Sequence, residues 1–283
     1  MKVLITGAKG FVGRNLCLTL EQMPGIEVLK YDLGDEAKLD GYLSGCDFVM
    51  HLAGVNRPKD PAEFKTGNTV FTEDILAKLA ERSNPPPVLL SSSIQAALDN
   101  DYGKSKAAAE EAVRAYGEKT GAPVYIYRLA NVFGKWCRPN YNSAVATWVY
   151  NIARDLPIMV RDPTATVTLV YIDDVVWSFI GCLDLFNAEK QRGRDAEKKE
   201  MEGYSAPSVT LRLCVKNKGV LSVEPSYTRT LGEIVGLIKS FHDEPQNLMV
   251  PDQADGFTKK LYSTYLAALP ADKFSYPLTM HCD

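Results

Sequence analysis

One glycine-rich junction near the N-terminus constrains the fold of this chain most strongly. The apolar run Lys2–Thr6 leads into T-G-A-K-G-F-V-G at residues 6–13, and the apolar residues that follow recur at helical spacing. Glycines at these positions permit a tight turn, close backbone approach to a pyrophosphate, and close packing of the helix on the sheet. The helix start adds N–H groups and partial positive charge. The junction therefore predicts a dinucleotide site that includes Gly7, Lys9, Gly10, Phe11, Val12 and Gly13.

Apolar runs and helical patterns alternate along the first half of the chain. The pattern predicts strands at 27–31, 46–52, 87–91 and 123–129, and helices at 68–82 and 102–120. Strand and helix in alternation are typical of a parallel sheet with helices on both faces. We therefore predict an α/β fold, a Rossmann-type doubly wound parallel sheet.

The second half of the chain is less regular and predicts a smaller C-terminal substrate-binding subdomain. We expect a dinucleotide-binding core over 1–130 with later returns near 166–186, and the subdomain mainly over 131–270. A mixed-charge stretch forms an insertion at 187–207, which we interpret as a solvated loop or exposed helix. Residues 271–283 are interpreted as a tail or linker stub.

Local patterns predict the elements of this second half. Residues 166–172 read as a strand and 174–186 as a buried helix. Alternation at 209–215, a turn, and the run 220–224 predict a hairpin. Thr230 and Glu233 form a capping box that opens a helix running to Phe241.

Composition excludes several classes of protein. The net charge of −3, from 32 basic and 35 acidic residues, does not call for nucleic acid as a partner. The six cysteines are scattered without a C-x-x-C pair, which predicts free thiols in the cytoplasm and no metal site. No apolar run approaches about 18 residues, so we expect no membrane span. The strand that starts at the N-terminus argues against a secretory leader.

Asp32 follows the second predicted strand, where a carboxylate can bind the adenosine ribose and repel a 2′-phosphate. That position favours NAD(H). Lys9, Lys30 or Arg57 could instead neutralise a 2′-phosphate, and Asp32 could contact the adenine ring. The residues therefore leave NAD(H) and NADP(H) open as cofactors.

Tyr102 and Lys106 stand four residues apart on a predicted helix, so that both lie on one face. A phenol has an ordinary pKa near 10, and a neighbouring ammonium can lower it. The serines Ser91–Ser93 end the preceding strand, where ligand-facing groups of an open α/β sheet lie. A hydroxyl there, from Ser93 or Ser92, can hold a substrate oxygen beside Tyr102. The four residues form the predicted catalytic set.

Several strings together resemble the extended short-chain dehydrogenase/reductases. They are the junction at 6–13, H-L-A-G at 51–54, S-S-S at 91–93, Y-G-K-S-K at 102–106, R-L-A-N-V-F-G at 128–134 and Y-I-D-D-V at 171–175. Longer strings, such as H-L-A-G-V-N-R-P at 51–58 and F-G-K-W-C-R-P-N-Y-N-S at 133–143, are similar to one narrower group. That group is the capsular-polysaccharide UDP-sugar 4-ketoreductases of UDP-N-acetyl-L-fucosamine synthesis.

The resemblance implies reduction of the C4 keto group of a UDP-4-keto-6-deoxy-N-acetylhexosamine. It implies that Tyr102 protonates O4, that Lys106 binds the nicotinamide ribose, and that Asn68 braces the catalytic helix. Further cofactor contacts are implied at Leu52, Ala53, Gly54 and Ser91, and substrate contacts at Asn131 and Asn142. Many relatives hold the diphosphate with an arginine just before the Y-I-D-D-V strand end. Here that place holds threonine and valine, and Arg138, Arg154 or Arg161 could substitute by charge.

Two other functions remain open at this point. A nucleotide-sugar 4-epimerase would use the same residues, whereas a dehydratase is disfavoured because Ile94, Gln95 and Ala96 supply no carboxylate after the serines. A non-catalytic dinucleotide-binding scaffold or sensor is disfavoured by the intact Tyr–Lys pair. We expect a homodimer through the helices at 68–82 and 102–120. The narrower group carries a C-terminal metal-binding cupin domain, which we expect here to be separate or truncated.

Overall fold

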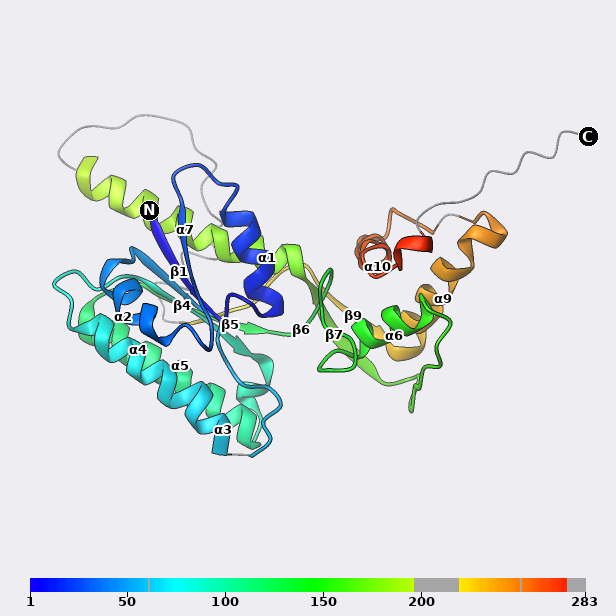
Figure 1. Cartoon of the computed structure of the whole chain (residues 1–283), viewed down its shortest axis with the longest axis horizontal. Helices are drawn as coiled ribbons and strands as arrows, with labels where there is room; N and C mark the ends of the chain where they lie inside the picture. Colours follow the sequence, from blue (N-terminus) through cyan, green and yellow to red (C-terminus); the bar gives the residue numbers. More distant parts are fainter. Residues whose placement is uncertain (61, 196–218, 250, 274–283) are drawn as a thin grey trace, which may run out of the picture. The chain divides into compact units, whose positions relative to one another are not determined.

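The first unit, Met1–Ala130 with Asp173–Glu224, is built on a parallel sheet. The computed structural model describes residues 1–60, 62–195, 219–249 and 251–273 (Figure 1). Within this part of the chain the sheet has six strands. In spatial order they are β2 (Glu27–Tyr31), β1 (Lys2–Thr6), β3 (Phe48–His51), β4 (Val88–Ser93), β5 (Val124–Leu129) and β8 (Val220–Leu221). The strand β1 lies between β2 and β3, so the strand order reverses there, and sheets of this kind bind ligands at the carboxyl ends of such strands.

The central strands are apolar because both of their faces are covered. Every residue of β3 is buried, and Val3, Leu4 and Ile5 of β1 have no exposed surface. Figure 1 shows α1 (Phe11–Leu20) and α7 (Ile172–Asp195) on one face of the sheet, with the other face covered by three helices. These are α2 (Glu36–Gly45), α4 (Phe71–Ala80) and α5 (Asp101–Thr120). The doubly wound Rossmann-type fold predicted from the sequence is therefore confirmed.

Local sequence signals fix the ends of α5, the helix that carries Tyr102 and Lys106. The Asn100 side chain caps its first turn by accepting a hydrogen bond of 2.7 Å from the Gly103 N–H. Gly121, at φ +73°, ends the helix in the left-handed conformation that favours glycine. The start of α5 is thus held at a defined position after the 3₁₀ turn η2 (Ile94–Ala97).

The structure changes several predicted boundaries. The helix predicted at 68–82 begins instead as α3 (Ala62–Phe64) and a π-helical turn, η1 (Lys65–Val70), before α4. The helix α2 was not predicted, because Leu43 is its only buried residue and it shows little apolar periodicity. The helix predicted at 174–186 is longer, since α7 continues to Asp195.

The predicted hairpin is only partly described. Its first strand, 209–215, lies outside the described residues. Of the second, 220–224, two residues form β8, which pairs in parallel with β5 at the edge of the sheet. The hairpin itself stays a prediction, because only one of its two strands is among the described residues.

The second unit, Asn131–Ile172 with Pro225–Asp283, has a smaller mixed sheet. Its strand β7 (Thr166–Tyr171) pairs in parallel with β6 (Asn131–Phe133) and antiparallel with β9 (Ser226–Thr230). The strand predicted at 166–172 therefore belongs here, and the return to the first unit begins at Asp173. The described helices of this unit are α6 (Ala144–Ile152), α9 (Leu231–Asn247), α10 (Gly256–Leu266) and the 3₁₀ turn η3 (Ala271–Lys273).

The predicted capping box is present at the start of α9. The Thr230 hydroxyl accepts a hydrogen bond from the Glu233 N–H, and the Glu233 carboxylate accepts one from the Thr230 N–H. The helix extends beyond Phe241 to Asn247. Neither α6 nor α10 was predicted. α6 is only nine residues long, although its buried residues Val145, Trp148, Val149 and Ile152 recur at helical spacing.

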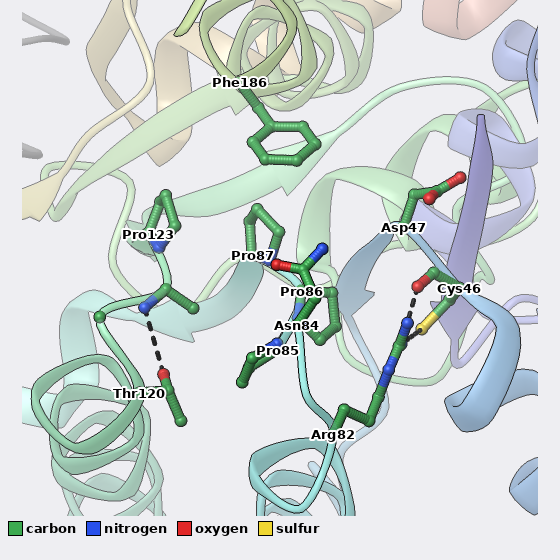
Figure 2. A pocket seen from close by; sticks show the side chains of 12 residues that line it. Cys46, Asp47, Arg82, Asn84, Pro85, Pro86, Pro87, Thr120, Pro123 and Phe186 are labelled. Carbon is green, nitrogen blue, oxygen red and sulfur yellow. Dashed lines mark hydrogen bonds between the residues drawn. The ribbon is translucent and has the colours of Figure 1, made fainter. Parts of the chain in front are cut away.

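A hollow of about 200 Å³ lies at the amino ends of β3, β4 and β5 (Figure 2). Arg82 lines it and donates hydrogen bonds of 2.9 and 2.8 Å to the carbonyl oxygens of Leu43 and Cys46. This hollow is at the sheet edge opposite the one where ligands of such folds bind. Its arginine serves to hold a loop of the fold. None of the helices in the described part of the chain combines the length and apolar character needed to span a bilayer.

The core under α4 gives a direct test of this packing. Leu79 has no exposed surface and packs in the cluster between the sheet and its helices. We expect Leu79→Ala to lower the free energy of unfolding by about 2–5 kcal/mol in urea titration. Leu33, which is 81% exposed, is the matched control, and Leu33→Ala should change the free energy of unfolding by less than about 0.5 kcal/mol. Equal effects of the two substitutions would contradict the packing described here.

Candidate active site

The glycine turn between β1 and α1 leaves open backbone where a pyrophosphate would lie. Gly7 has φ +71°, and a Cβ there would stand 2.8 Å from the Ala53 nitrogen. A Cβ on Gly13 would stand 2.1 Å from the Gly7 carbonyl oxygen, so only glycine allows α1 to start so close to the turn. No side chain caps the start of α1 among the described residues. Its first N–H groups therefore suit an anionic ligand.

Asp32 lies at the end of β2 and is tied to the glycine turn. One of its carboxylate oxygens accepts a 2.7 Å hydrogen bond from the Lys9 N–H, and the other accepts a 2.9 Å bond from the Leu33 N–H. Each oxygen has a further lone pair for a ribose hydroxyl. The Lys9 side chain points to Asp35, which also pairs with Lys38 at 2.9 Å. The structure thus brings together Asp32 and Lys9, two of the predicted cofactor contacts.

Tyr102 and Lys106 lie on α5 beside the carboxyl end of β4. The Lys106 ammonium donates a 2.8 Å hydrogen bond to the Ser91 carbonyl oxygen. Lys106 is 6% exposed, and burial lowers its pKa to about 8, while the negative charge of Glu110 raises it. Burial also raises the pKa of Tyr102, whereas a hydrogen bond with the Ser93 side chain lowers it. The structure therefore joins Tyr102 to Ser93 and places Lys106 on the strand end.

The side chains of Ser92 and Ser93 have different partners. Successive strand residues point to opposite sides of a sheet. The Ser92 hydroxyl is buried and donates its hydrogen bond to the carboxylate of Glu110. Ser93 also accepts a 3.2 Å hydrogen bond from the Gln95 N–H, which begins η2. This turn brings the chain from β4 to the start of α5.

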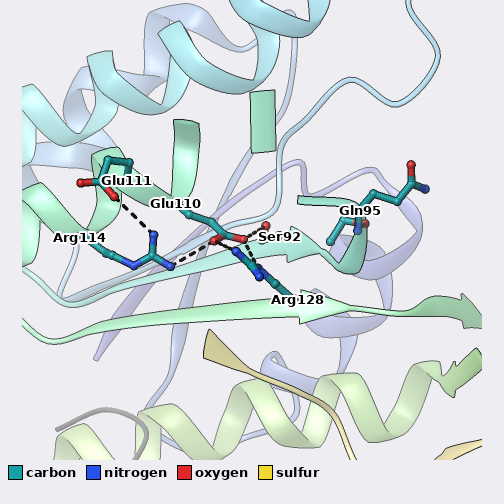
Figure 3. A network of polar contacts seen from close by, with 7 residues as sticks. Ser92, Gln95, Glu110, Glu111, Arg114 and Arg128 are labelled. Atoms are coloured by element: carbon teal, nitrogen blue, oxygen red, sulfur yellow. Dashed lines mark hydrogen bonds and ion pairs between the residues drawn. The ribbon is translucent and has the colours of Figure 1, made fainter. Parts of the chain in front are cut away.

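Glu110 gathers the cations around it into one cluster, which Figure 3 shows. Arg128 of β5 donates two hydrogen bonds to the two carboxylate oxygens, at 2.9 and 2.8 Å, and Arg114 donates a third at 3.2 Å. Burial raises the pKa of the Glu110 carboxyl, but the bonds from Arg128, Ser92 and Arg114 hold it below its ordinary value. Glu110 has no exposed surface and stays charged. The cluster fastens α5 to the ends of β4 and β5.

Asn68 lies in the π-helical turn η1 and contacts two segments of the site. Its side-chain oxygen accepts a 2.8 Å hydrogen bond from the Val55 N–H, and its amide nitrogen donates to the Ser105 hydroxyl at 3.0 Å. Ser105 in turn donates to the Tyr102 carbonyl oxygen at 2.8 Å. A Cβ on Gly54 would stand 2.8 Å from the Asn68 oxygen. Single π turns are frequent at functional sites, and here the turn aims Asn68 at the helix of Tyr102.

The predicted substrate contacts lie in the second unit. Asn131 is exposed and donates a 3.2 Å hydrogen bond to the Thr168 carbonyl oxygen, and Asn142 is exposed on the loop before α6. The Arg138 guanidinium stands 5.2 Å from the ring of Tyr141. Arg154 is held at the ring of Tyr150, at 3.8 Å. Its guanidinium donates to the Ala268 carbonyl oxygen, which makes Arg154 a structural contact of the fold.

Sequence reasoning missed Glu110, Ser105 and Arg128 as residues of the site. The spacing of Glu110 from Lys106, i to i+4 on one helix, is a signal that could have found it. Ser105 lies in the Y-G-K-S-K motif and Arg128 in the R-L-A-N-V-F-G motif; these motifs indicate the family but assign no role to either residue. Among the described residues, no cluster of histidine, cysteine and carboxylate side chains could hold a metal ion.

This geometry defines a class of protein: a dinucleotide-dependent enzyme with a tyrosine–lysine pair on a doubly wound sheet. A model of the NAD dependent epimerase/dehydratase family matches residues 3–193. The chain belongs to that family. The resemblance to extended short-chain dehydrogenase/reductases is therefore confirmed.

Individual relatives agree with this assignment. UDP-2-acetamido-2,6-beta-L-arabino-hexul-4-ose reductase of Pseudomonas aeruginosa is 45% identical over 284 aligned positions, which cover 100% of this chain and 69% of that protein. The structure of the capsular polysaccharide assembling protein CapF from Staphylococcus aureus superposes with a TM-score of 0.78 at 39% identity, covering 100% and 69% of the two chains. UDP-glucuronic acid 4-epimerase from Bacillus cereus, with a TM-score of 0.70 at 16% identity over 95% and 99%, shares the fold.

The burial of Lys106 predicts a dependence of stability on pH. Its folded pKa of about 8 lies below the ordinary 10.5, so between these values the unfolded chain binds more protons than the folded one. Stability therefore rises with pH across this window, and the full penalty is present below pH 8. We expect Lys106→Met to raise the free energy of unfolding at pH 7 by about 2–3 kcal/mol, with the gain shrinking toward pH 10.5. Urea titrations between pH 7 and 10.5 measure it, and a constant difference between the two proteins would contradict the assignment.

Proposed function

We propose that this chain reduces the C4 keto group of a UDP-4-keto-6-deoxy-N-acetylhexosamine with NADPH or NADH, for surface-polysaccharide synthesis. The identity of 45% along the whole chain with a UDP-hexulose reductase is the observation that carries the proposal. The capsular polysaccharide assembling protein, at 39% identity, supports the proposal that the product is used for a surface polysaccharide. Epimerases of nucleotide sugars are more distant in sequence.

The proposed roles follow from where the side chains lie. A reduced nicotinamide, when bound by this unit, would supply the hydride for the C4 carbon. Tyr102 protonates O4, and Ser93 holds that oxygen beside the phenol. A phenol is protonated at neutral pH, as a proton donor must be, and burial raises the pKa of Tyr102 further above its ordinary value.

Lys106 has two proposed tasks at this site. Its ammonium binds the nicotinamide ribose and stabilises the phenolate that Tyr102 leaves behind. The carboxylate of Glu110 raises the pKa of Lys106 against the effect of burial, and thereby favours the charged form that both tasks need. We therefore include Glu110 as a residue that supports the pair.

The proposed cofactor site extends from the glycine turn to the strand ends. Asp32 contacts the adenosine ribose, and the uncapped start of α1 binds the pyrophosphate. The further proposed contacts are Gly7, Lys9, Gly10, Phe11, Val12, Gly13, Leu52, Ala53, Gly54, Asn68 and Ser91. We propose Asn131, Asn142 and Arg138 of the second unit as contacts of the UDP-sugar.

We also propose a cytoplasmic homodimer. Cys17, Cys46, Cys137 and Cys182 are free thiols, which suits a reducing compartment. The outward faces of α4 and α5 carry small side chains that would let two helix pairs approach closely, namely Ala77, Ala108 and Ala115. Light scattering at micromolar concentration tests the dimer, and a monomeric mass would contradict it.

The phenol is tested by Tyr102→Phe. We expect turnover to fall by about 10²–10⁴-fold while dinucleotide binding is retained, because only the transferred proton is lost. Tyr116→Phe is the matched control, since it removes a phenol on the same helix that donates to the Pro86 carbonyl oxygen. Turnover should be unchanged in this control. Unchanged turnover in Tyr102→Phe would overturn the catalytic assignment.

Cofactor choice is tested by Asp32→Asn, which removes a negative charge and keeps the shape of the side chain. We expect the ratio of kcat/KM for NADPH to that for NADH to rise by about 10-fold, since one charge repulsion with the 2′-phosphate is lost. Initial rates with each reduced cofactor measure the ratio. A ratio equal to that of the wild type would show that Asp32 does not contact the ribose.

The reaction type is tested with an enzymatically generated UDP-4-keto-6-deoxy-N-acetylhexosamine. A reductase consumes one reduced nicotinamide for each sugar converted, which absorbance and NMR measure together. Interconversion of the two C4 epimers of the corresponding 4-hydroxy UDP-sugar, with no net change in the cofactor, would instead establish a 4-epimerase. Cofactor binding without conversion of this or other 4-ketosugars would favour a non-catalytic role.

A further inference from the structure

A buried histidine stands between the cofactor turn and the catalytic helix, outside the roles assigned above. His51, the last residue of β3, is 2% exposed. Its Nδ1 atom lies 2.7 Å from the Thr6 hydroxyl, and its Nε2 atom lies 2.8 Å from the Thr72 hydroxyl. Both threonines are also buried. All three side chains belong to the first unit.

Counting protons fixes the direction of the bond to Thr72. The Thr72 hydroxyl has one proton, and it donates this proton to the backbone carbonyl oxygen of Asn68 at 2.6 Å. Thr72 can therefore only accept from His51. The Nε2 atom of His51 must then carry a proton.

The bond to Thr6 is fixed in the same way. Burial lowers the pKa of His51 to about 3, and the positive charge of Lys106 acts in the same direction, so the ring is neutral. With its proton on Nε2, the ring accepts at Nδ1, and the Thr6 hydroxyl donates to it. The oxygen of Thr6 in turn accepts a 3.2 Å hydrogen bond from the Ala53 N–H.

The two ends of this chain of hydrogen bonds lie at the two halves of the proposed site. At one end, Ala53 is the residue against which the glycine turn makes its closest approach, since a Cβ on Gly7 would stand 2.8 Å from the Ala53 nitrogen. At the other end, Asn68 donates to Ser105, which holds the first turn of α5 at the Tyr102 carbonyl oxygen. Every hydrogen bond between these ends has one possible direction.

We propose that His51 is a positioning residue: a neutral imidazole, protonated on Nε2 only, that holds the dinucleotide-binding segment at Ala53 and the Asn68 brace of the catalytic helix at a fixed separation. The inference rests on the proposed function only where it concerns turnover. A ring that merely filled space, packed on Phe71 at 5.7 Å between centroids, would need neither nitrogen.

The tautomer is tested without any substrate, by ¹⁵N NMR of the histidine rings in the full chain. We expect His51 to show the neutral Nε2–H form from pH 5 to 9, with its signals assigned by their loss in His51→Gln. A signal of the Nδ1–H form, or titration of this ring to imidazolium within that range, would overturn the proposal.

Two half-replacements separate the two bonds. An asparagine oxygen can occupy the place of Nδ1, so His51→Asn can keep the bond from Thr6 and lose the one to Thr72. A glutamine N–H can occupy the place of Nε2, so His51→Gln can keep the bond to Thr72 and lose the one from Thr6. We expect His51→Asn to lower kcat by about 10-fold with the dinucleotide Kd little changed, and His51→Gln to raise that Kd by about 10-fold, the ratio that corresponds to one buried hydrogen bond.

A double-mutant cycle tests whether the ring couples the two ends. Thr6→Val and Thr72→Val each remove one hydroxyl at nearly constant shape. In the presence of His51 we expect the loss of dinucleotide affinity and of kcat in the double variant to be about 10-fold smaller than the product of the two single losses. Either substitution alone already interrupts the series of hydrogen bonds. In a His51→Phe background this coupling should vanish. Effects that multiply in both backgrounds would overturn the proposal.

The cycle is measured on the Kd for NADPH and NADH, by nicotinamide fluorescence, as well as on kcat. Val49→Ala, a buried change on the same strand, is the control for a general loss of stability, and it should leave Kd and kcat within about 2-fold. If the wild type fails to convert any 4-ketosugar, the proposed function fails, while the tautomer and the dinucleotide Kd still decide the role of His51. A His51→Phe variant with wild-type Kd and kcat would show that the ring only fills space.

Discussion

The ammonium group of Lys106 carries a charge on a side chain that is almost fully buried, and the position of α5 against β4 depends on that charge. Burial alone disfavours the charged form, and the loss of hydration is severe unless other dipoles and charges replace it. The Ser91 carbonyl accepts one of its hydrogen bonds, and Glu110 opposes the effect of burial on its pKa. Strand β4 must therefore end beside the second turn of α5.

Glu110 is a second buried charge, and it lies further from the reacting atoms than Lys106. A carboxylate with no exposed surface needs partners of its own, and it obtains them from Arg128, Arg114 and Ser92. These partners lie on three elements, so satisfying the carboxylate also fixes how α5 lies on the sheet. Position and electrostatics are thus set by the same contacts. The precision of the tyrosine–lysine pair comes from the helix and strands that Glu110 joins.

Much of this could be predicted from the sequence, because the decisive signals are local. The glycine junction, the tyrosine–lysine spacing and the apolar runs each lie within a few residues, and they led to the doubly wound sheet. The choice between Ser92 and Ser93 could not be made, since it depends on which side of β4 faces α5. The contact of Asp32 with the Lys9 N–H also joins separate segments. The helix α2 escaped prediction because it has few apolar residues, and α6 escaped although its buried residues recur at helical spacing over nine residues.

The sharing of one carboxylate by several partners has a consequence for how such a chain can change over generations. Replacing Glu110 alone would leave the buried Ser92 and the partly buried Arg128 without their common acceptor, and replacing Arg128 alone would leave the buried carboxylate short of donors. Joint replacement by apolar side chains of similar volume removes the whole requirement at once. We therefore expect substitutions to be correlated among descendants of this sequence at the four positions that share this carboxylate. These positions are 92, 110, 114 and 128.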